Sequence, residues 1–280
     1  MILPVAGAVL GYLNARLGLS NDLPTLRAYL QTIRTQKAIY RKDELNLFYE
    51  LEELAVGRPG SSRGVPETAE RTFLIYQDRE WTFKETYETV LKYGTWLKTK
   101  FGVAPGEVVA LDFMNCDTFV FIWFGLWAIG AKPAFINYNL TSAPLIHCVR
   151  ASTARVLLVG SELQSAFPTA VVDALASPMN KEDDADISST SVKTTFFTRE
   201  LEDEIMGSDG LREPNEARAG QMGQDMAVLI FTSGTTGLPK PAIVSWTKIC
   251  VASLFFAKYL PLKASDRLYT VSFPFVFAKY

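Results

Sequence analysis

The segment 226-MAVLIFTSGTTGLPK-240 carries the pattern that decides how this sequence folds. Met226 to Phe231 form an apolar run with the length of a buried strand. Thr232 to Lys240 follow directly and consist mostly of threonine, serine and glycine, and a second extended run covers Ala242 to Trp246. This order predicts a buried strand, a polar loop and a second strand.

The loop between the two predicted strands combines the chemical groups that bind phosphate. Its two glycines can adopt positive φ and let backbone N–H groups approach a ligand closely. Its four hydroxyls can donate hydrogen bonds to phosphate oxygens, and its lysine adds a positive charge. Because such a strand ends at the rim of a sheet, we predict a phosphate-binding site there. The residues assigned to it are Thr232, Ser233, Gly234, Thr235, Thr236, Gly237 and Lys240.

This loop differs from the phosphate loop of common nucleoside triphosphatases. That loop requires GxxxxGK[ST], whereas Gly237 is followed here by Leu238, Pro239 and Lys240. A phosphate bound at the N-terminus of a helix is therefore not implied. The simplest alternative is a turn of small polar residues without a ligand, but nine residues in this order after an apolar strand favour the binding site.

Strands and helices alternate in the part of the chain before this loop. Short apolar runs predict strands at 108–113, 131–136 and 155–159, with helices between them at 117–129 and from Pro144 onward. Strand, helix and strand in this order predict βαβ units, and therefore an α/β fold with a mainly parallel sheet.

Several neighbouring segments carry weaker signals. A hairpin is expected over 71–83, and Thr82 with Glu85 matches a capping box that opens a helix ending near Gly102. The apolar run 117–129 invites a transmembrane interpretation, but its 13 residues are too few to span a bilayer, so we expect it to pack against the sheet. The stretch 161–224 looks less regular. Its acidic run at 182–184 is expected to face solvent rather than to bind a divalent ion.

The bulk composition excludes several classes of function. The 28 Lys and Arg residues against 30 Asp and Glu give a net charge of −2, so no global field favours nucleic acid as a partner. Cys116, Cys148 and Cys250 are widely spaced, which argues against a disulfide framework and a zinc site. The one histidine, His147, lies in an apolar segment, so a packing or hydrogen-bonding role is favoured over that of a general base. We therefore assign no catalytic residue and no metal ligand.

The N-terminal 13 residues, MILPVAGAVLGYL, are apolar and uncharged. They are too few for a span and lack the basic start of a signal peptide. Two interpretations remain, a membrane anchor that is interfacial or re-entrant and a buried start of the fold, with a slight preference for the membrane. Asn21 and Asp22 are expected to cap a helix, 25–54 to form one or two helices, and 57–66 to lead into the main domain.

The motif TSGTTGLPK resembles the phosphate-binding signature of the adenylate-forming superfamily, which includes acyl-CoA synthetases, luciferases and peptide-synthetase adenylation domains. Upstream, YLNARLGLSNDL at 12–23 is similar to the N-terminus of fungal fatty-acid transport proteins, which are very-long-chain acyl-CoA synthetases. Softer similarities to that family lie at 135–137, 139–140 and 145–148. The resemblance extends over nearly the whole chain, to about Thr270.

The resemblance implies a two-step reaction of a fatty acid with ATP·Mg²⁺ and then with CoA. Thr232 to Gly237 would hold the β- and γ-phosphates, and Lys240 would assist them electrostatically. It also implies a segment 1–56 with membrane association and a partial AMP-binding domain at 67–280, with an irregular insert near 178–224. The fold would be part of the large N-terminal domain of such an enzyme. The expected location is a cytosol-facing membrane surface of the endoplasmic reticulum, peroxisome, lipid droplet or plasma membrane.

The sequence departs from the family pattern at its end. The later adenine motif, the ribose-binding aspartate and the adenylation lysine have no match within these residues, and no histidine follows Pro274. We therefore expect negligible ligase activity from this polypeptide alone, and a tendency to aggregate through exposed apolar surface. Two alternatives stay open: a non-catalytic, membrane-associated protein that binds or carries fatty acids, and another acid–CoA ligase, such as one for aryl acids.

Overall fold

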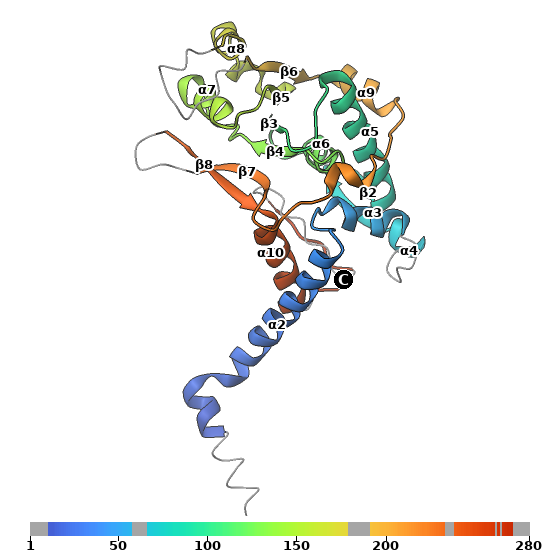
Figure 1. Ribbon diagram of the computed structural model, residues 1–280, viewed down its shortest axis with the longest axis vertical. Coiled ribbons are helices and arrows are strands. Elements are labelled where there is room, and N and C mark those ends of the chain that lie inside the picture. The colour runs from blue at the N-terminus through green and yellow to red at the C-terminus, as the bar shows by residue number, and fades with distance from the viewer. Residues whose placement is uncertain are drawn as a thin grey trace, which may run out of the picture. The chain divides into compact units, whose positions relative to one another are not determined.

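The computed structural model describes residues 11–57, 66–178, 191–232, 238–260, 262–263 and 265–270 (Figure 1). The chain forms two compact units. The larger unit comprises Asp43–Trp246 with Thr270–Pro274, and the smaller unit comprises Met1–Lys42, Thr247–Tyr269 and Phe275–Tyr280. Each unit is described by itself.

A six-stranded sheet of order β6-β5-β3-β4-β7-β8 forms the centre of the larger unit. The pairs β3–β4, β3–β5, β4–β7 and β5–β6 are parallel, and only β7–β8 is antiparallel among these strands. The predicted α/β fold with a mainly parallel sheet is confirmed. The strands are β3 (Val108–Asp112), β4 (Lys132–Phe135), β5 (Val156–Gly160), β6 (Lys193–Phe197), β7 (Met226–Thr232) and β8 (Lys240–Ser245).

Helices connect these strands, and a separate hairpin precedes them. The predicted hairpin is confirmed as β1 (Thr72–Tyr76) and β2 (Arg79–Thr82). The remaining elements of the larger unit are α3 (Phe48–Val56), α4 (Pro66–Ala69), α5 (Phe83–Phe101), α6 (Asp117–Ala128), α7 (Ser142–Ala151), α8 (Thr169–Ala176), α9 (Arg199–Met206) and two 3₁₀ helices, η1 (Ser161–Ala166) and η2 (Asn215–Arg218). Helix α7 begins two residues before the expected Pro144, because Thr141 already has the extended backbone of an N-cap.

Helices α5 and α6 form the tightest helix pair of the larger unit. The predicted capping box is present: Glu85 N donates to Thr82 Oγ1 at 3.1 Å, and Thr82 N donates to Glu85 Oε2 at 2.9 Å. Gly102 ends α5 with a φ of 62°, as expected for a C-terminal glycine. A Cβ at Gly125 would lie 3.1 Å from the backbone N of Gly94, so the two helices depend on glycine where they cross.

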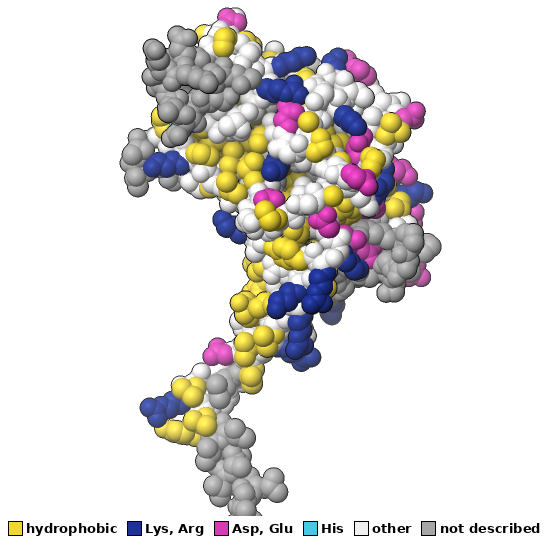
Figure 2. Space-filling view, in the orientation of Figure 1, with side chains coloured by type: hydrophobic (Ala, Val, Ile, Leu, Met, Phe, Trp, Pro, Cys, Tyr) yellow, Lys and Arg dark blue, Asp and Glu magenta, His cyan; other side chains and the backbone are white. Residues whose placement is uncertain are grey.

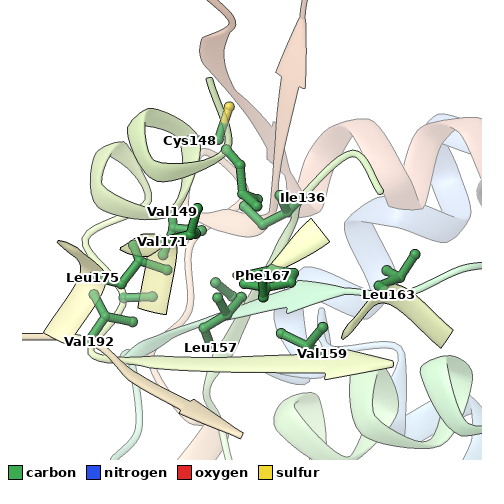
Figure 3. Packing of buried hydrophobic residues seen from close by; sticks show 13 residues of the cluster. Ile136, Cys148, Val149, Leu157, Val159, Leu163, Phe167, Val171, Leu175 and Val192 are labelled. Carbon is green, nitrogen blue, oxygen red and sulfur yellow. The ribbon is translucent and has the colours of Figure 1, made fainter. Parts of the chain in front are cut away.

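One face of the sheet packs against α7 and α8 through a cluster of buried apolar side chains (Figure 3). The apolar strands β3 and β5 contribute side chains with almost no exposed surface, such as Ala110 and Leu157. This burial supplies the hydrophobic stabilisation that fixes the direction of the strands, and with it the edge at which they end. The cluster comprises Ala110, Ile136, Leu145, Cys148, Val149, Ala154, Leu157, Val159, Leu163, Phe167, Val171, Leu175 and Val192.

The region 161–224 is more regular than the sequence suggested. Helix α8 lies in this region, and strand β6 pairs with β5 to form one edge of the sheet. Thr198 is the N-cap of α9, and its hydroxyl accepts a hydrogen bond from Leu201 N at 3.3 Å. The expectation of an irregular insert near 178–224 is therefore wrong for 193–206. It failed because β6 (KTTFF) is short and the sequence before it is polar. The acidic run at 182–184 lies outside the described residues.

The smaller unit contains α2 (Leu19–Arg41) and most of α10 (Trp246–Tyr259). The expected helix start at Asn21 and Asp22 is wrong: Gly18, with a φ of 67°, is the N-cap, and Pro24 lies inside the helix. Asp22 instead lies in the first turn, where its charge complements the helix dipole. No helix in the described part of the chain is both long enough and apolar enough to cross a bilayer.

Candidate phosphate-binding hairpin

The two predicted strands are present, and they pair as the antiparallel hairpin of β7 and β8. Leu229 pairs with Ile243, and Thr232 pairs with Lys240 as the last partners before the connection. Strand β7 is also parallel to β4, through Leu229 and Ala134. The connection therefore leaves the sheet at the carboxyl ends of the parallel strands, which is the edge where α/β proteins bind ligands.

Thr232 and Lys240 are the two assigned residues that the structure describes. Both are exposed, and the Thr232 hydroxyl donates a long hydrogen bond of 3.4 Å to the carbonyl of Lys240. This contact connects the two ends of the loop and leaves the Lys240 ammonium exposed for a ligand. The other assigned residues, Ser233, Gly234, Thr235, Thr236 and Gly237, lie outside the described residues.

His147 of α7 contacts the end of this loop. Its Nε2 lies 3.1 Å from the carbonyl oxygen of Pro239, a residue 92 positions further along the chain. Because a carbonyl only accepts, Nε2 carries the proton and His147 donates. The hydrogen-bonding role predicted for His147 is confirmed. Its partner could not be predicted, because the contact depends on how α7 packs beside β8.

A buried carboxyl group at the same edge of the sheet was not anticipated. Asp112, the last residue of β3, is 1% exposed, and neither carboxyl oxygen has a hydrogen-bond partner among the described residues. Burial, and then the negative charge of Glu162, raise the pKa of Asp112 to about 7. Glu162 follows β5 and accepts a hydrogen bond of 3.4 Å from Met114 N. The sequence signal was an apolar run, VVALD, that ends in an acid.

Asp112 and Glu162 mark the point where the chain reverses its direction of travel across the sheet. From β3 the chain moves to β4 on one side, and it then returns to β5 on the other side of β3. In α/β proteins ligands commonly bind beyond the strand ends at such a switch point. Here two acids lie at this point, which disfavours an anion, so the hairpin is the better candidate for binding phosphate.

The cysteines are not placed for nucleophilic chemistry. All three are free thiols, and burial raises the pKa of both Cys116 and Cys148 to about 12. A protonated thiol is a poor nucleophile and a poor metal ligand. Within the described residues, no group of three or more His, Cys, Asp or Glu side chains is placed to hold a metal ion.

The mainly parallel sheet defines an α/β protein, and the segment rich in glycine and hydroxyl groups follows β7 at the carboxyl edge of that sheet, where α/β proteins generally bind ligands. The family model described as AMP-binding enzyme matches residues 62–278. The chain belongs to this family, and the predicted membership of the adenylate-forming superfamily is confirmed.

Several curated relatives of the chain are named fatty-acid transport proteins. A very long-chain fatty acid transport protein of Cochliobolus heterostrophus is 28% identical over 265 residues, which cover 95% of this chain and 38% of the relative. Its counterpart in Saccharomyces cerevisiae is 32% identical over 206 residues, covering 70% of this chain and 28% of the relative. The chain therefore spans less than half the length of either relative.

Solved structures support the fold. The o-succinylbenzoate CoA synthetase of Bacillus subtilis matches with a TM-score of 0.56 and 20% identity, over 79% of this chain and 38% of that one. A fatty acyl CoA synthetase of Mycobacterium tuberculosis matches with a TM-score of 0.52 and 20% identity, over 73% and 35% of the two chains. At this identity the likeness establishes the arrangement of helices and strands alone.

Proposed function

We propose that the hairpin of β7 and β8 binds the β- and γ-phosphates of ATP through Thr232 to Gly237 and Lys240. The observation that carries the proposal is the position of TSGTTGLPK, which connects two paired strands at the carboxyl edge of the sheet. Membership of the AMP-binding enzyme family supports ATP as the nucleotide.

The chemistry proposed for this site is positioning and charge stabilisation. Hydroxyl and amide donors would orient the triphosphate, and the exposed Lys240 ammonium would offset its negative charge. Mg²⁺ would be held mainly by the phosphate oxygens, since this ion keeps several waters and usually takes only one or two protein carboxylates. In the family reaction the carboxylate of the acid attacks the α-phosphorus of ATP to give an acyl-adenylate and release pyrophosphate, and the thiol of CoA then displaces AMP to give the acyl-CoA.

The substrate class we propose is a long- or very-long-chain fatty acid, supported by the names of the relatives. We further propose a membrane-associated segment within residues 1–42 and a partial AMP-binding domain, 67–280, on a cytosol-facing membrane. The end of the first segment expected at 56 is too late, because α3 (Phe48–Val56) is buried in the larger unit. A non-catalytic protein that binds or carries fatty acids is the second candidate, favoured by the fatty-acid transport names of the relatives. Another acid–CoA ligase would use the same hairpin.

Binding of ATP tests the site without requiring turnover. Titration of the 280-residue chain with Mg²⁺·ATP should give saturable binding, and Lys240→Ala should weaken it roughly 10-fold or more, because a charge-assisted contact contributes about 1.5–3 kcal/mol. Lys84→Ala removes an exposed lysine from α5 and should leave the affinity unchanged. Equal affinity of the Lys240→Ala variant and the unmodified chain, or no binding at all, would refute the site.

A turnover assay tests whether this chain acts as a ligase by itself. We propose that the 280-residue chain alone has negligible ligase activity, because no match to the family's adenylation lysine is recognisable in it. An ATP–pyrophosphate exchange assay with oleate or a C24 acid should therefore remain at the level of Lys240→Ala. Exchange well above that level would establish a ligase and contradict this part of the proposal.

A further inference from the structure

Helix α2 exposes a stripe of leucine side chains. Leu23, Leu26 and Leu30 are 61%, 52% and 47% exposed. Their spacing of three and four residues places them on one face of the helix. Tyr29, at 51% exposed, lies beside this stripe. A monomeric protein rarely leaves such a row of large apolar side chains in water without a use for it.

The opposite face of α2 contains two small buried residues, and Ile39 is partly buried on the same face. Ala28 and Thr32 are 3% and 0% exposed, and the Thr32 hydroxyl donates to the carbonyl of Ala28 at 2.9 Å. A surface helix of a globular protein normally buries its leucines and exposes its polar side chains. Between Leu23 and Thr32, helix α2 instead exposes its leucines and buries an alanine and a threonine, so the leucines are available to an external partner.

Basic residues line one flank of the leucine stripe. Arg27, Arg34 and Arg41 recur every seven residues and therefore share a side of the helix, and all three are exposed. With Lys37 the helix carries four basic side chains against one acidic residue, Asp22. Figure 2 shows hydrophobic side chains along one side of α2 and Lys and Arg side chains along the other.

We propose that α2 docks on the surface of an anionic lipid bilayer, with its leucines at the acyl boundary and its arginines on lipid phosphates. An apolar stripe beside a basic flank is the pattern of an interfacial helix, which lies in the membrane plane. A second copy of the chain fits this face less well, because pairing of two α2 helices would bring their arginines together. The proposal refines the membrane association proposed above by naming its surface.

Vesicle binding tests this surface on the complete 280-residue chain. Flotation with vesicles of phosphatidylserine and phosphatidylcholine should recover the protein, and Leu23→Ser/Leu26→Ser/Leu30→Ser should lower partitioning at least 10-fold. The matched control, Leu211→Ser/Met222→Ser, removes exposed apolar side chains from the larger unit and should bind as the unmodified chain does. Hydrogen exchange of residues 19–41 should slow when vesicles are added.

The arginine flank predicts lipid selectivity. Arg27→Gln/Arg34→Gln should lose the preference for phosphatidylserine over pure phosphatidylcholine vesicles, together with most of the salt dependence. If the unmodified chain binds vesicles and the leucine variant binds equally, membrane association stands but α2 is not its surface. If the unmodified chain never binds, both fail, whereas the ATP site is untouched. A dimer that the leucine substitutions dissociate would assign the stripe to a second copy and overturn the proposal.

Discussion

Two helices of this protein carry large apolar side chains, which are buried in one helix and exposed in the other. Helix α6, DTFVFIWFGLWA, is apolar on every side, and 11 of its 12 residues are buried. Helix α2 contains both leucines and arginines, and its leucines at 23, 26 and 30 are exposed. The sequence of α6 is the one that invites a membrane interpretation, yet α6 is the helix enclosed by protein.

The difference between α6 and α2 lies in what covers each helix. Helix α6 packs against α5, and its Trp127 indole donates to the carbonyl of Ala227 in β7 at 3.0 Å. It can be apolar all round because protein surrounds it. Helix α2 presents its large apolar side chains to solvent. The high hydropathy of α6 therefore reflects its burial, whereas the proposal of a docking surface on α2 rests on the exposure of one face of that helix.

The largest effect that tests this comparison comes from one leucine in each helix. Leu126 of α6 is 0% exposed, so Leu126→Ala should lower the free energy of unfolding by about 2–5 kcal/mol. Leu26 of α2 is 52% exposed, and Leu26→Ala should change it by no more than about 0.5 kcal/mol. Urea unfolding followed by tryptophan fluorescence measures the effect of Leu126→Ala, because all five tryptophans lie in the larger unit. Far-UV circular dichroism, which also reports the helices of the smaller unit, measures the effect of Leu26→Ala.

The two unfolding experiments also define how the comparison would break. A loss of more than about 2 kcal/mol in Leu26→Ala would mean that the leucine stripe of α2 stabilises the fold instead of facing a partner. The slope of the urea transition should stay constant in both variants, since neither substitution changes the surface exposed on unfolding very much.

A second test concerns a polar group buried in the larger unit. Folding raises the pKa of Asp112 from an ordinary carboxyl value to about 7. Below the ordinary value both folded and unfolded states are protonated, and Asp112 imposes no cost. As the pH rises towards 7 the unfolded state ionises first, so stability falls, and the cost is complete above pH 7. A shift of about three pKa units corresponds to a cost of about 4 kcal/mol, which is an upper limit.

Asp112→Asn should remove this pH dependence. Its advantage in unfolding free energy over the unmodified protein should grow between about pH 4 and pH 8 and then level off. The exposed Asp173→Asn on α8 is the matched control and should show no such growth. A constant difference between Asp112→Asn and the unmodified protein across this range would show that Asp112 titrates normally.

Much of the fold follows from the sequence because local signals and burial agree in it. The start of α5 is specified by the capping box of Thr82 and Glu85, and its end by Gly102. The strands β3 and β5 are specified by their apolar runs, which are buried in the sheet. Strand β6 was missed because KTTFF is only partly buried at the sheet edge, so its pairing with β5 supplies what its composition does not. The start of α2 was misplaced because Gly18 capped it through a positive φ, without a side-chain signal.

The site was predictable only in part, for a related reason. The composition of the segment 226–240 indicated the chemistry and the hairpin, since both are encoded within a few consecutive residues. Asp112 and His147 acquire their roles from packing between distant segments. Nothing near Asp112 in the sequence shows that burial and the charge of Glu162 will raise its pKa, and nothing near His147 shows that the Pro239 carbonyl will accept its hydrogen bond.

The smallest expected effect concerns α7, whose burial is intermediate between that of α6 and that of α2. It buries Leu145 and Cys148 against the sheet, and His147 donates to Pro239 at the end of the loop. His147→Ala should lower the free energy of unfolding by about 1 kcal/mol, the contribution of one hydrogen bond. It should also accelerate hydrogen exchange at β8 and weaken Mg²⁺·ATP binding a few-fold, because the Lys240 end of the loop loses its tether.

His147→Gln sharpens the interpretation, since its side-chain amide keeps an N–H donor of similar reach. Recovery of ATP affinity in the Gln variant, with loss in the Ala variant, would identify His147 as a positioning residue for the loop. Equal losses in both variants would instead indicate that the imidazole ring is needed for packing alone. In that case α7 would resemble α6, a helix whose side chains act through burial, and the loop would depend on the hairpin without help from α7.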